Sequence, residues 1–266
     1  MLQRIASALV ALPVYFFFIY TDQLYTLGIL LVSSVISLAC LYEFYQVSAI
    51  KDRGGMPFIL PGVVAGLAVN VLLYMYAFGR VYGYHRYIDL FDMRPFIAIL
   101  LLLCIIASIL QVAFRSLDEG IYALSTTVFG VMFIVIPYSH IILMKALPDG
   151  LYYIIILHIV IMLNDSFAYF GGVFFGRHKA GLLVSPNKSW EGYFSGMLFS
   201  IIGMIVTNEV IRIFFLKQLF SLPEAVILGV VLSALGNIGD LIESAIKRDA
   251  DVTDSGSIIP GHGGMW

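Results

Sequence analysis

The sequence predicts an all-α fold, a polytopic integral membrane protein with about eight transmembrane helices. Hydrophobic residues make up 61% of its 266 positions and charged residues only 12%, against roughly 25% charged residues in soluble domains. The mean hydropathy is +0.96. The apolar residues fall into windows of about 20, the length that crosses the hydrocarbon core of a bilayer as a helix. Because the connectors between windows are short, no soluble domain fits between them.

The predicted spans cover residues 5–20, 26–47, 57–79, 95–114, 122–147, 150–176, 192–215 and 225–248. No small-residue cleavage pattern follows the first window, so we expect a retained span and not a removed signal. The connector 80–94 mixes charges with tyrosines and predicts an interfacial loop or a short amphipathic helix. Cys40 and Cys104 lie inside apolar windows and are expected to be buried thiols. Glu43, near one end of the second span, is expected at the membrane interface.

By function we divide the chain into two parts. Residues 1–150 are expected to form a scaffold of lipid-facing helices, and residues 151–266 a catalytic core with a basic connector and a polar tail. With the N-terminus inside, nine of the 15 Lys and Arg residues fall on the inner side, the sign of the positive-inside rule. This orientation puts the connector 177–191 and the tail on the same, cytoplasmic, side.

Net charge and histidine spacing exclude two other kinds of site. The net charge is −2, and a nucleic-acid surface needs a basic stripe that this sequence lacks. The five histidines show no paired spacing of the kind that binds zinc.

The last predicted span becomes polar along one face. At steps of three and four residues this face carries Ser233, Gly236, Asn237, Asp240, Glu243, Ser244 and Lys247. Arg248 follows, and then a tail, residues 250–266, with Asp254 and the glycine-rich turn 260–264. The backbone N–H groups of such a turn could form an anion-binding nest. Acid, base and glycine at this spacing suit a divalent cation with phosphates bound to it.

A second carboxylate, Asp165, lies deep in the span 150–176. At 1.5 Å per residue it is roughly 16 Å from the end of its helix, and Asp240 is roughly 12 Å from Arg248. A charged side chain near mid-membrane costs at least about 2.5 kcal/mol, so each acid should face a wet cavity and have a partner. A shared Mg²⁺ is one such partner. The alternative is a structural role, in which each acid is protonated or pairs with a neighbouring base.

The connector between the sixth and seventh spans offers further phosphate ligands. Pro186 fixes a turn, Ser189 is expected to cap the next helix, and Lys188 presents a compact ammonium. Arg177 fits a ligand role and a positive-inside role equally well. Pairs of glycines four residues apart flank the connector, Gly172 with Gly176 before it and Gly192 with Gly196 after it. This spacing predicts close packing of the two helices.

These motifs resemble the phosphatidate cytidylyltransferases, also called CDP-diacylglycerol synthases, a family of integral membrane enzymes. The matching residues are Ser244-x-x-Lys247-Arg248-x5-Asp254-x5-Pro260-x-His262-Gly263-Gly264, Ser185-Pro186-x-Lys188-x-Trp190-Glu191-Gly192 and Asp165-x-x-Ala168-Tyr169. The resemblance covers roughly residues 160–266. Two features depart from the family pattern. Thr253 stands where the family has a lysine, and the expected Asp-Arg pair after the double glycine does not occur before Trp266.

The resemblance implies a CTP-dependent transferase of phospholipid biosynthesis that condenses CTP with phosphatidate to CDP-diacylglycerol and pyrophosphate. It places the site at the cytoplasmic face of the inner membrane, in contact with membrane lipid. The implied catalytic residues are Asp240, Asp165, Lys247 and Arg248. The implied substrate-binding residues are Lys188, Ser185, Arg177, Ser244, His262, Gly263 and Gly264. Mg²⁺ is expected on Asp240 and Asp165, with Asp254 as a further ligand; a second cation and a homodimer are left open.

Two alternatives remain at this stage. A CTP-dependent polyprenol or phytol kinase has a similar membrane core, but there a hydroxyl attacks the γ-phosphorus of CTP. A cation-coupled transporter could use Asp165 and Asp240 as ion ligands, which leaves the basic connector and the glycine turn without a role.

Overall fold

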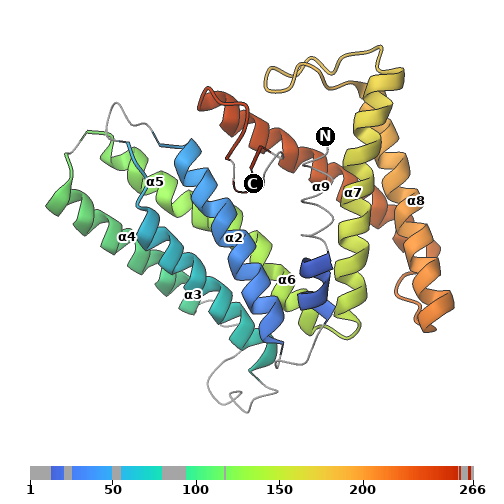
Figure 1. The fold of residues 1–266 in the computed structure, drawn as a ribbon, viewed down its shortest axis with the longest axis horizontal. Helices are drawn as coiled ribbons and strands as arrows, with labels where there is room; N and C mark the ends of the chain where they lie inside the picture. The colour runs from blue at the N-terminus through green and yellow to red at the C-terminus, as the bar shows by residue number, and fades with distance from the viewer. Residues whose placement is uncertain are drawn as a thin grey trace. The chain divides into compact units, whose positions relative to one another are not determined.

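The computed structural model shown in Figure 1 describes residues 13–20, 26–49, 55–79, 94–116, 118–256, 258 and 263–264. Within these ranges the chain is helical and contains no β-strand, which confirms the all-α class. Seven helices of the described part are long and apolar enough to cross a membrane. Of the first predicted span, only residues 13–20 are described, and they are helical.

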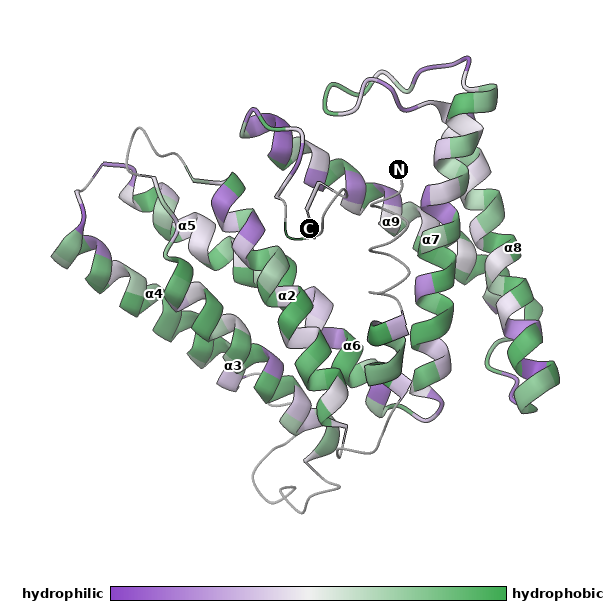
Figure 2. Ribbon diagram, in the orientation of Figure 1, coloured by the Kyte–Doolittle hydropathy of each residue, from purple (hydrophilic) through white to green (hydrophobic). Residues whose placement is uncertain are grey.

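The helices follow the predicted windows closely. They are α2 (Leu27–Val47), α3 (Ile59–Phe78), α4 (Arg94–Phe114), α5 (Gly120–Gly130), η3 (Val131–Val135), α6 (Ile136–Ala146), α7 (Gly150–Phe175), α8 (Trp190–Phe215) and α9 (Leu222–Asp249). Figure 2 shows that most residues of these helices are hydrophobic and that hydrophilic residues gather toward the end of α9. The predicted connector 80–94 lies outside the described residues except for Arg94, the first residue of α4.

The predicted span 122–147 is one continuous run of three helical segments, Gly120–Ala146. Its middle, η3, is a π-helix that ends two residues before Pro137. Proline has no backbone N–H, so the regular i→i−4 hydrogen bond at this position is absent and a wider turn takes its place. The apolar window did not indicate this local change.

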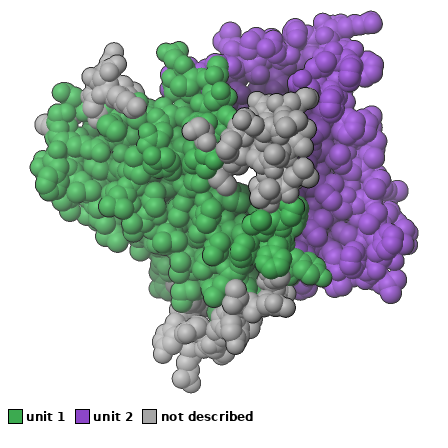
Figure 3. Space-filling view, viewed as in Figure 1, with its two compact units in different colours: residues 1–147, 250–266 green, residues 148–249 purple. Residues whose placement is uncertain are grey.

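The structure divides into two compact units, residues 1–147 with 250–266 and residues 148–249, which Figure 3 shows in different colours. The tail is therefore grouped with the first unit, whereas our division by function keeps it with the last helices. That functional division concerns roles, and it stays a prediction.

In the first unit, a buried amide ties α2, α3 and α6 together. Asn70 of α3 is fully buried, and its Oδ1 accepts hydrogen bonds from Ser33 Oγ at 3.1 Å and Ser139 Oγ at 2.9 Å. Its Nδ2 donates to Ser37 Oγ at 3.0 Å. Hydrogen bonds of this kind hold helices together in a membrane, where hydrophobic burial between helices supplies no driving force.

In the second unit, α7 and α8 form a closely packed pair. A Cβ at Gly192 would lie 2.8 Å from the carbonyl oxygen of Ala168, and one at Gly196 would lie 2.9 Å from that of Asn164. Such distances are tolerated only without a side chain, so the predicted small-residue contact between the two helices is confirmed.

The opposite end of this unit is tied by polar contacts. Asn208 Nδ2 donates to Phe220 O at 3.0 Å, and Phe220 N donates to Asn208 Oδ1 at 3.2 Å, which fixes the loop between α8 and α9. Lys217 pairs with Asp149, and this hydrogen bond raises the pKa of the Lys217 ammonium. Arg212 pairs with Glu209 on the exposed side of α8.

Candidate active site

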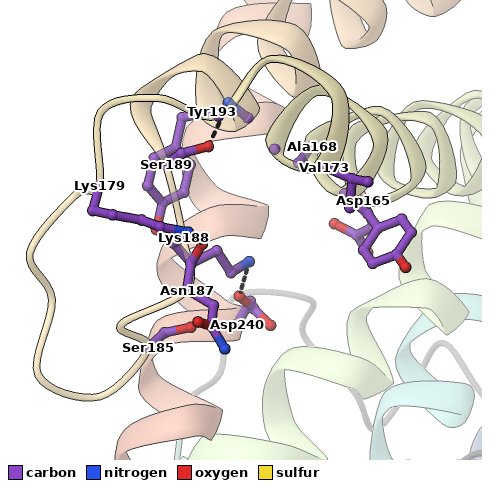
Figure 4. A pocket seen from close by; sticks show the side chains of 14 residues that line it. Asp165, Ala168, Val173, Lys179, Ser185, Asn187, Lys188, Ser189, Tyr193 and Asp240 are labelled. Atoms are coloured by element: carbon purple, nitrogen blue, oxygen red, sulfur yellow. Dashed lines mark hydrogen bonds and ion pairs between the residues drawn. The ribbon is translucent and has the colours of Figure 1, made fainter.

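A polar pocket of about 670 Å³ lies within the second unit. Four elements line it: α7, the connector 177–189, the start of α8, and α9. Its polar side chains include Asp165, Lys179, Ser185, Lys188, Tyr193 and Asp240 (Figure 4). Four of the residues predicted to form the site, the two acids with Ser185 and Lys188, are therefore brought together.

Asp240 forms an ion pair with Lys188. The Lys188 Nζ lies 2.5 Å from the Asp240 Oδ2, and the two side chains are 32% and 43% exposed. An ammonium has three N–H donors, so Lys188 can hold this carboxylate and still donate to a bound phosphate. The base that pairs with Asp240 thus comes from the connector and not from α9 itself.

Asp165 lies on α7, across the pocket from this ion pair in Figure 4. Its Oδ1 accepts a hydrogen bond from Asn164 Nδ2 at 3.0 Å. Asp240 and Lys188 line the same pocket. The pocket therefore carries two carboxylates and the Lys188 ammonium. The ammonium can pair with an incoming anion, and the carboxylates can pair with the counter-ion of that anion.

A buried hydrogen-bond network stands behind the two acids. Asn164 is fully buried, and its Oδ1 accepts from Ser233 Oγ at 2.7 Å and Ser200 Oγ at 3.4 Å. Its Nδ2 donates to Asn237 Oδ1 at 3.3 Å as well as to Asp165. One amide thereby joins α7, α8 and α9 next to the acid-bearing positions. The sequence showed Ser233 and Asn237 on the polar face but gave no sign of Asn164 as their partner.

The connector is held in place by its own ends. Ser189 is buried and accepts a hydrogen bond from Gly192 N at 3.2 Å, which confirms that it caps α8. Ala180 N donates to Lys188 O at 2.9 Å, so the two arms of the connector run side by side. Glu191 accepts from His178 N at 3.1 Å and closes the base of the loop. Lys188 therefore lies in a loop whose two ends are joined by hydrogen bonds.

Other predicted residues of the second unit do not line this pocket. Lys247 pairs with Glu243 one turn earlier on α9. Arg177 and Arg248 are exposed, and Ser244 is half-buried. Their predicted roles in substrate binding and catalysis stay predictions.

The remaining predicted residues belong to the tail, in the first unit. Gly263 and Gly264 have φ of +78° and +134°, values that favour glycine. Gly256 N donates to Gly263 O at 3.1 Å, which closes the tail into a loop. Asp254 lies against Gly263 in this loop. His262 lies outside the described residues.

The pocket fits a magnesium ion in its donor chemistry. Within the described residues, no group of three or more His, Cys, Asp or Glu side chains comes together. Mg²⁺, however, is usually held by one or two carboxylates, with substrate phosphates and water completing its shell. Asp165 and Asp240 supply two carboxylates to one pocket.

The helices that are long and apolar enough to cross a membrane indicate an integral membrane protein. Its second unit carries a pocket lined by two carboxylates and two lysines. The chain belongs to the Cytidylyltransferase family, whose sequence profile matches residues 2–266. This confirms at the level of the family the resemblance drawn from the motifs.

Curated relatives extend over most of the chain. A protein of Staphylococcus haemolyticus named phosphatidate cytidylyltransferase is 28% identical over 237 residues, 89% of this chain and 82% of the relative. A protein of the same name from Staphylococcus saprophyticus is 27% identical over 237 residues, again 89% of this chain and 82% of the relative. One from Staphylococcus aureus is 26% identical over 241 residues, 90% of this chain and 83% of the relative.

Proposed function

We propose that this chain is a phosphatidate cytidylyltransferase, which condenses CTP with phosphatidate to CDP-diacylglycerol and pyrophosphate. The observation that carries the proposal is the family match along residues 2–266, together with relatives of that name over about nine-tenths of the chain. The pocket is chemically consistent with it, because lysines and carboxylates are what a phosphate and its counter-ion require.

In this reaction a phosphate oxygen of phosphatidate attacks the α-phosphorus of CTP. The bond between the α-phosphorus and the oxygen that bridges it to the β-phosphate breaks, and pyrophosphate leaves with that electron pair. The attacking oxygen is already ionised at neutral pH, so no strong general base is needed. The difficulty is to bring two polyanions together, and positioning with charge compensation lowers this barrier.

The lysines of the pocket meet this need. Lys188 and Lys179 line the pocket from the connector, and Ser185 adds a hydroxyl. As phosphates enter, Lys188 can share its N–H donors between Asp240 and a phosphate oxygen, so that the ammonium remains held at the reacting groups. Lys247, Arg248 and the tail glycines are proposed as further phosphate ligands.

Asp165 and Asp240 are the residues that would hold Mg²⁺. The ion, when bound, neutralises phosphate charge and polarises the reacting phosphoryl group. Asp254 is proposed as a further ligand of the ion. Metal titration tests whether a second cation binds.

The proposed setting is the inner membrane, with the pocket open to the cytoplasm and the acyl chains of phosphatidate left in the lipid. It rests on the distribution of Lys and Arg in the sequence and on eight spans, of which residues 5–20 are the first. A homodimer is an expectation that light scattering in detergent tests.

Position-specific labelling of CTP tests the reaction directly. With phosphatidate as acceptor, label on the α-phosphate of CTP should enter the lipid product, and label on the γ-phosphate should leave as pyrophosphate. If the γ-label enters a lipid alcohol and CDP accumulates, the protein is a lipid kinase instead. Cation flux into vesicles without CTP turnover would indicate the transporter.

A further inference from the structure

A buried carboxylate of α2 contacts the tail more than 200 residues further along the chain. Glu43 is only 2% exposed, so its side chain is buried within the protein. Its predicted position at the membrane interface stays a prediction. Its carboxylate accepts hydrogen bonds from Ser255 Oγ at 3.3 Å and from Ile258 N at 3.4 Å. Both segments belong to the first unit.

Two glycines of the tail lie close to this carboxylate. A Cβ at Gly256 would lie 2.7 Å from the Glu43 carboxyl carbon, and one at Gly264 would lie 2.8 Å from its Oε2. Ser255 Oγ also lies 3.3 Å from Gly263 O, so its one proton is shared between Glu43 and the tail backbone. A methyl group at either position requires the Glu43 carboxylate to move, and at Gly264 the Ser255 hydroxyl as well. Without a side chain, Gly256 and Gly264 let the tail lie close to Glu43.

A buried carboxylate is costly unless hydrogen bonds satisfy it. Glu43 is the only charged residue of α2, and hydrogen bonds from Ser255 and Ile258 of the tail offset part of this cost. The tail in turn continues directly from α9, which carries Asp240. Fixing the tail on α2 therefore fixes the chain that follows the acid-bearing helix.

We propose that Glu43 is a positioning residue that anchors the tail of the protein on α2. The first half of the chain then contributes to catalysis through this contact and not only as lipid-facing scaffold. The positioning role rests on the proposed function, because it assumes that the tail serves the cytidylyltransferase reaction. The anchoring itself does not.

Hydrogen exchange of peptides from the tail tests the anchoring without any substrate. In the full-length protein in detergent–lipid micelles, Glu43→Ala should speed exchange at the tail amides by about tenfold or more, the factor that corresponds to one hydrogen bond to a charged group. Glu43→Gln should have a smaller effect, because an amide oxygen still accepts. Glu209→Gln makes the same chemical change at an exposed ion pair of α8 and should leave tail exchange at the wild-type rate.

Turnover of the same variants tests the positioning. Because a displacement of about 1 Å can cost on the order of 100-fold, Glu43→Ala should lower kcat by roughly that factor, with a smaller change in KM. Gly256→Ala should have a similar effect. This effect should be partly rescued when it is combined with Glu43→Asp, whose shorter side chain leaves room for the added methyl group.

Wild-type exchange and wild-type kcat in a folded Glu43→Ala variant would overturn the proposal. Faster tail exchange with unchanged kcat would overturn the positioning role, and additive effects of Gly256→Ala and Glu43→Asp would refute the contact. If the wild type forms no CDP-diacylglycerol, the proposed function fails, while the exchange measurement still decides whether Glu43 anchors the tail.

Discussion

Asn164 gives the sharpest test of how the pocket is held together. Its side chain makes hydrogen bonds to Ser233, Ser200 and Asn237 on the two neighbouring helices and one to Asp165 beside it. Asn164→Ala removes all four. The three contacts between helices are worth about 0.6 kcal/mol each on average in a membrane protein, which gives about 2 kcal/mol in total. Ser233 is nearly fully buried, and the loss of its partner adds to this cost.

We therefore expect Asn164→Ala to lower the free energy of unfolding of the protein by about 2–3 kcal/mol. The variant should also lose turnover beyond this loss of stability, because α7 and α9 carry the two acids of the pocket. Denaturant titration in mixed micelles measures the first effect, and steady-state kinetics at a temperature where the variant is folded measures the second.

Asn208→Ala is the matched control. Asn208 is also a buried asparagine of the second unit, but it ties the loop between α8 and α9 and does not line the pocket. This variant should lose comparable stability and keep its kcat while folded. The reasoning is refuted if the two variants lose turnover equally, or if Asn164→Ala leaves both stability and kcat unchanged.

Three further substitutions address single contacts of the site. Lys188→Ala should lower kcat/KM for CTP roughly 10- to 100-fold in steady-state assays, and Lys188→Arg should recover only part of this, because a guanidinium keeps the charge but not the compact ammonium. Gly192→Ala should destabilise the protein by about 1–3 kcal/mol in thermal melts, because the added methyl group meets the Ala168 carbonyl. The control Gly239→Ala should leave the stability unchanged, because a methyl group there meets nothing within 4 Å. Ser189→Ala should cost about 1 kcal/mol by loss of the cap, and Ser189→Thr should retain most of the stability.

The sequence predicted the helices well because a bilayer imposes one length and one composition on every span. The predicted window 192–215 corresponds to Trp190–Phe215, and 225–248 corresponds to Leu222–Asp249. It also predicted a contact between residues close in the chain, the Ser189 cap of α8. This contact depends on local sequence alone.

What the sequence missed depends on residues far apart in the chain. Asn164 lies beside Asp165 in an apolar window, and its partners Ser200 and Ser233 are 36 and 69 residues away. The sequence also showed no sign that Glu43 contacts Ser255, 212 residues later. No periodicity within one helix reports such contacts, so only the folded structure shows them.

The central claim, that the pocket with Asp240 is where CTP and phosphatidate react, is tested most directly by pyrophosphate release. Purified wild type, Asp240→Asn and the control Glu209→Gln are compared in micelles with CTP, phosphatidate and Mg²⁺, each also omitted in turn. We predict release by wild type and Glu209→Gln only when both substrates and Mg²⁺ are present, and a loss of at least about 100-fold in folded Asp240→Asn. Release at the wild-type rate by folded Asp240→Asn would contradict the account.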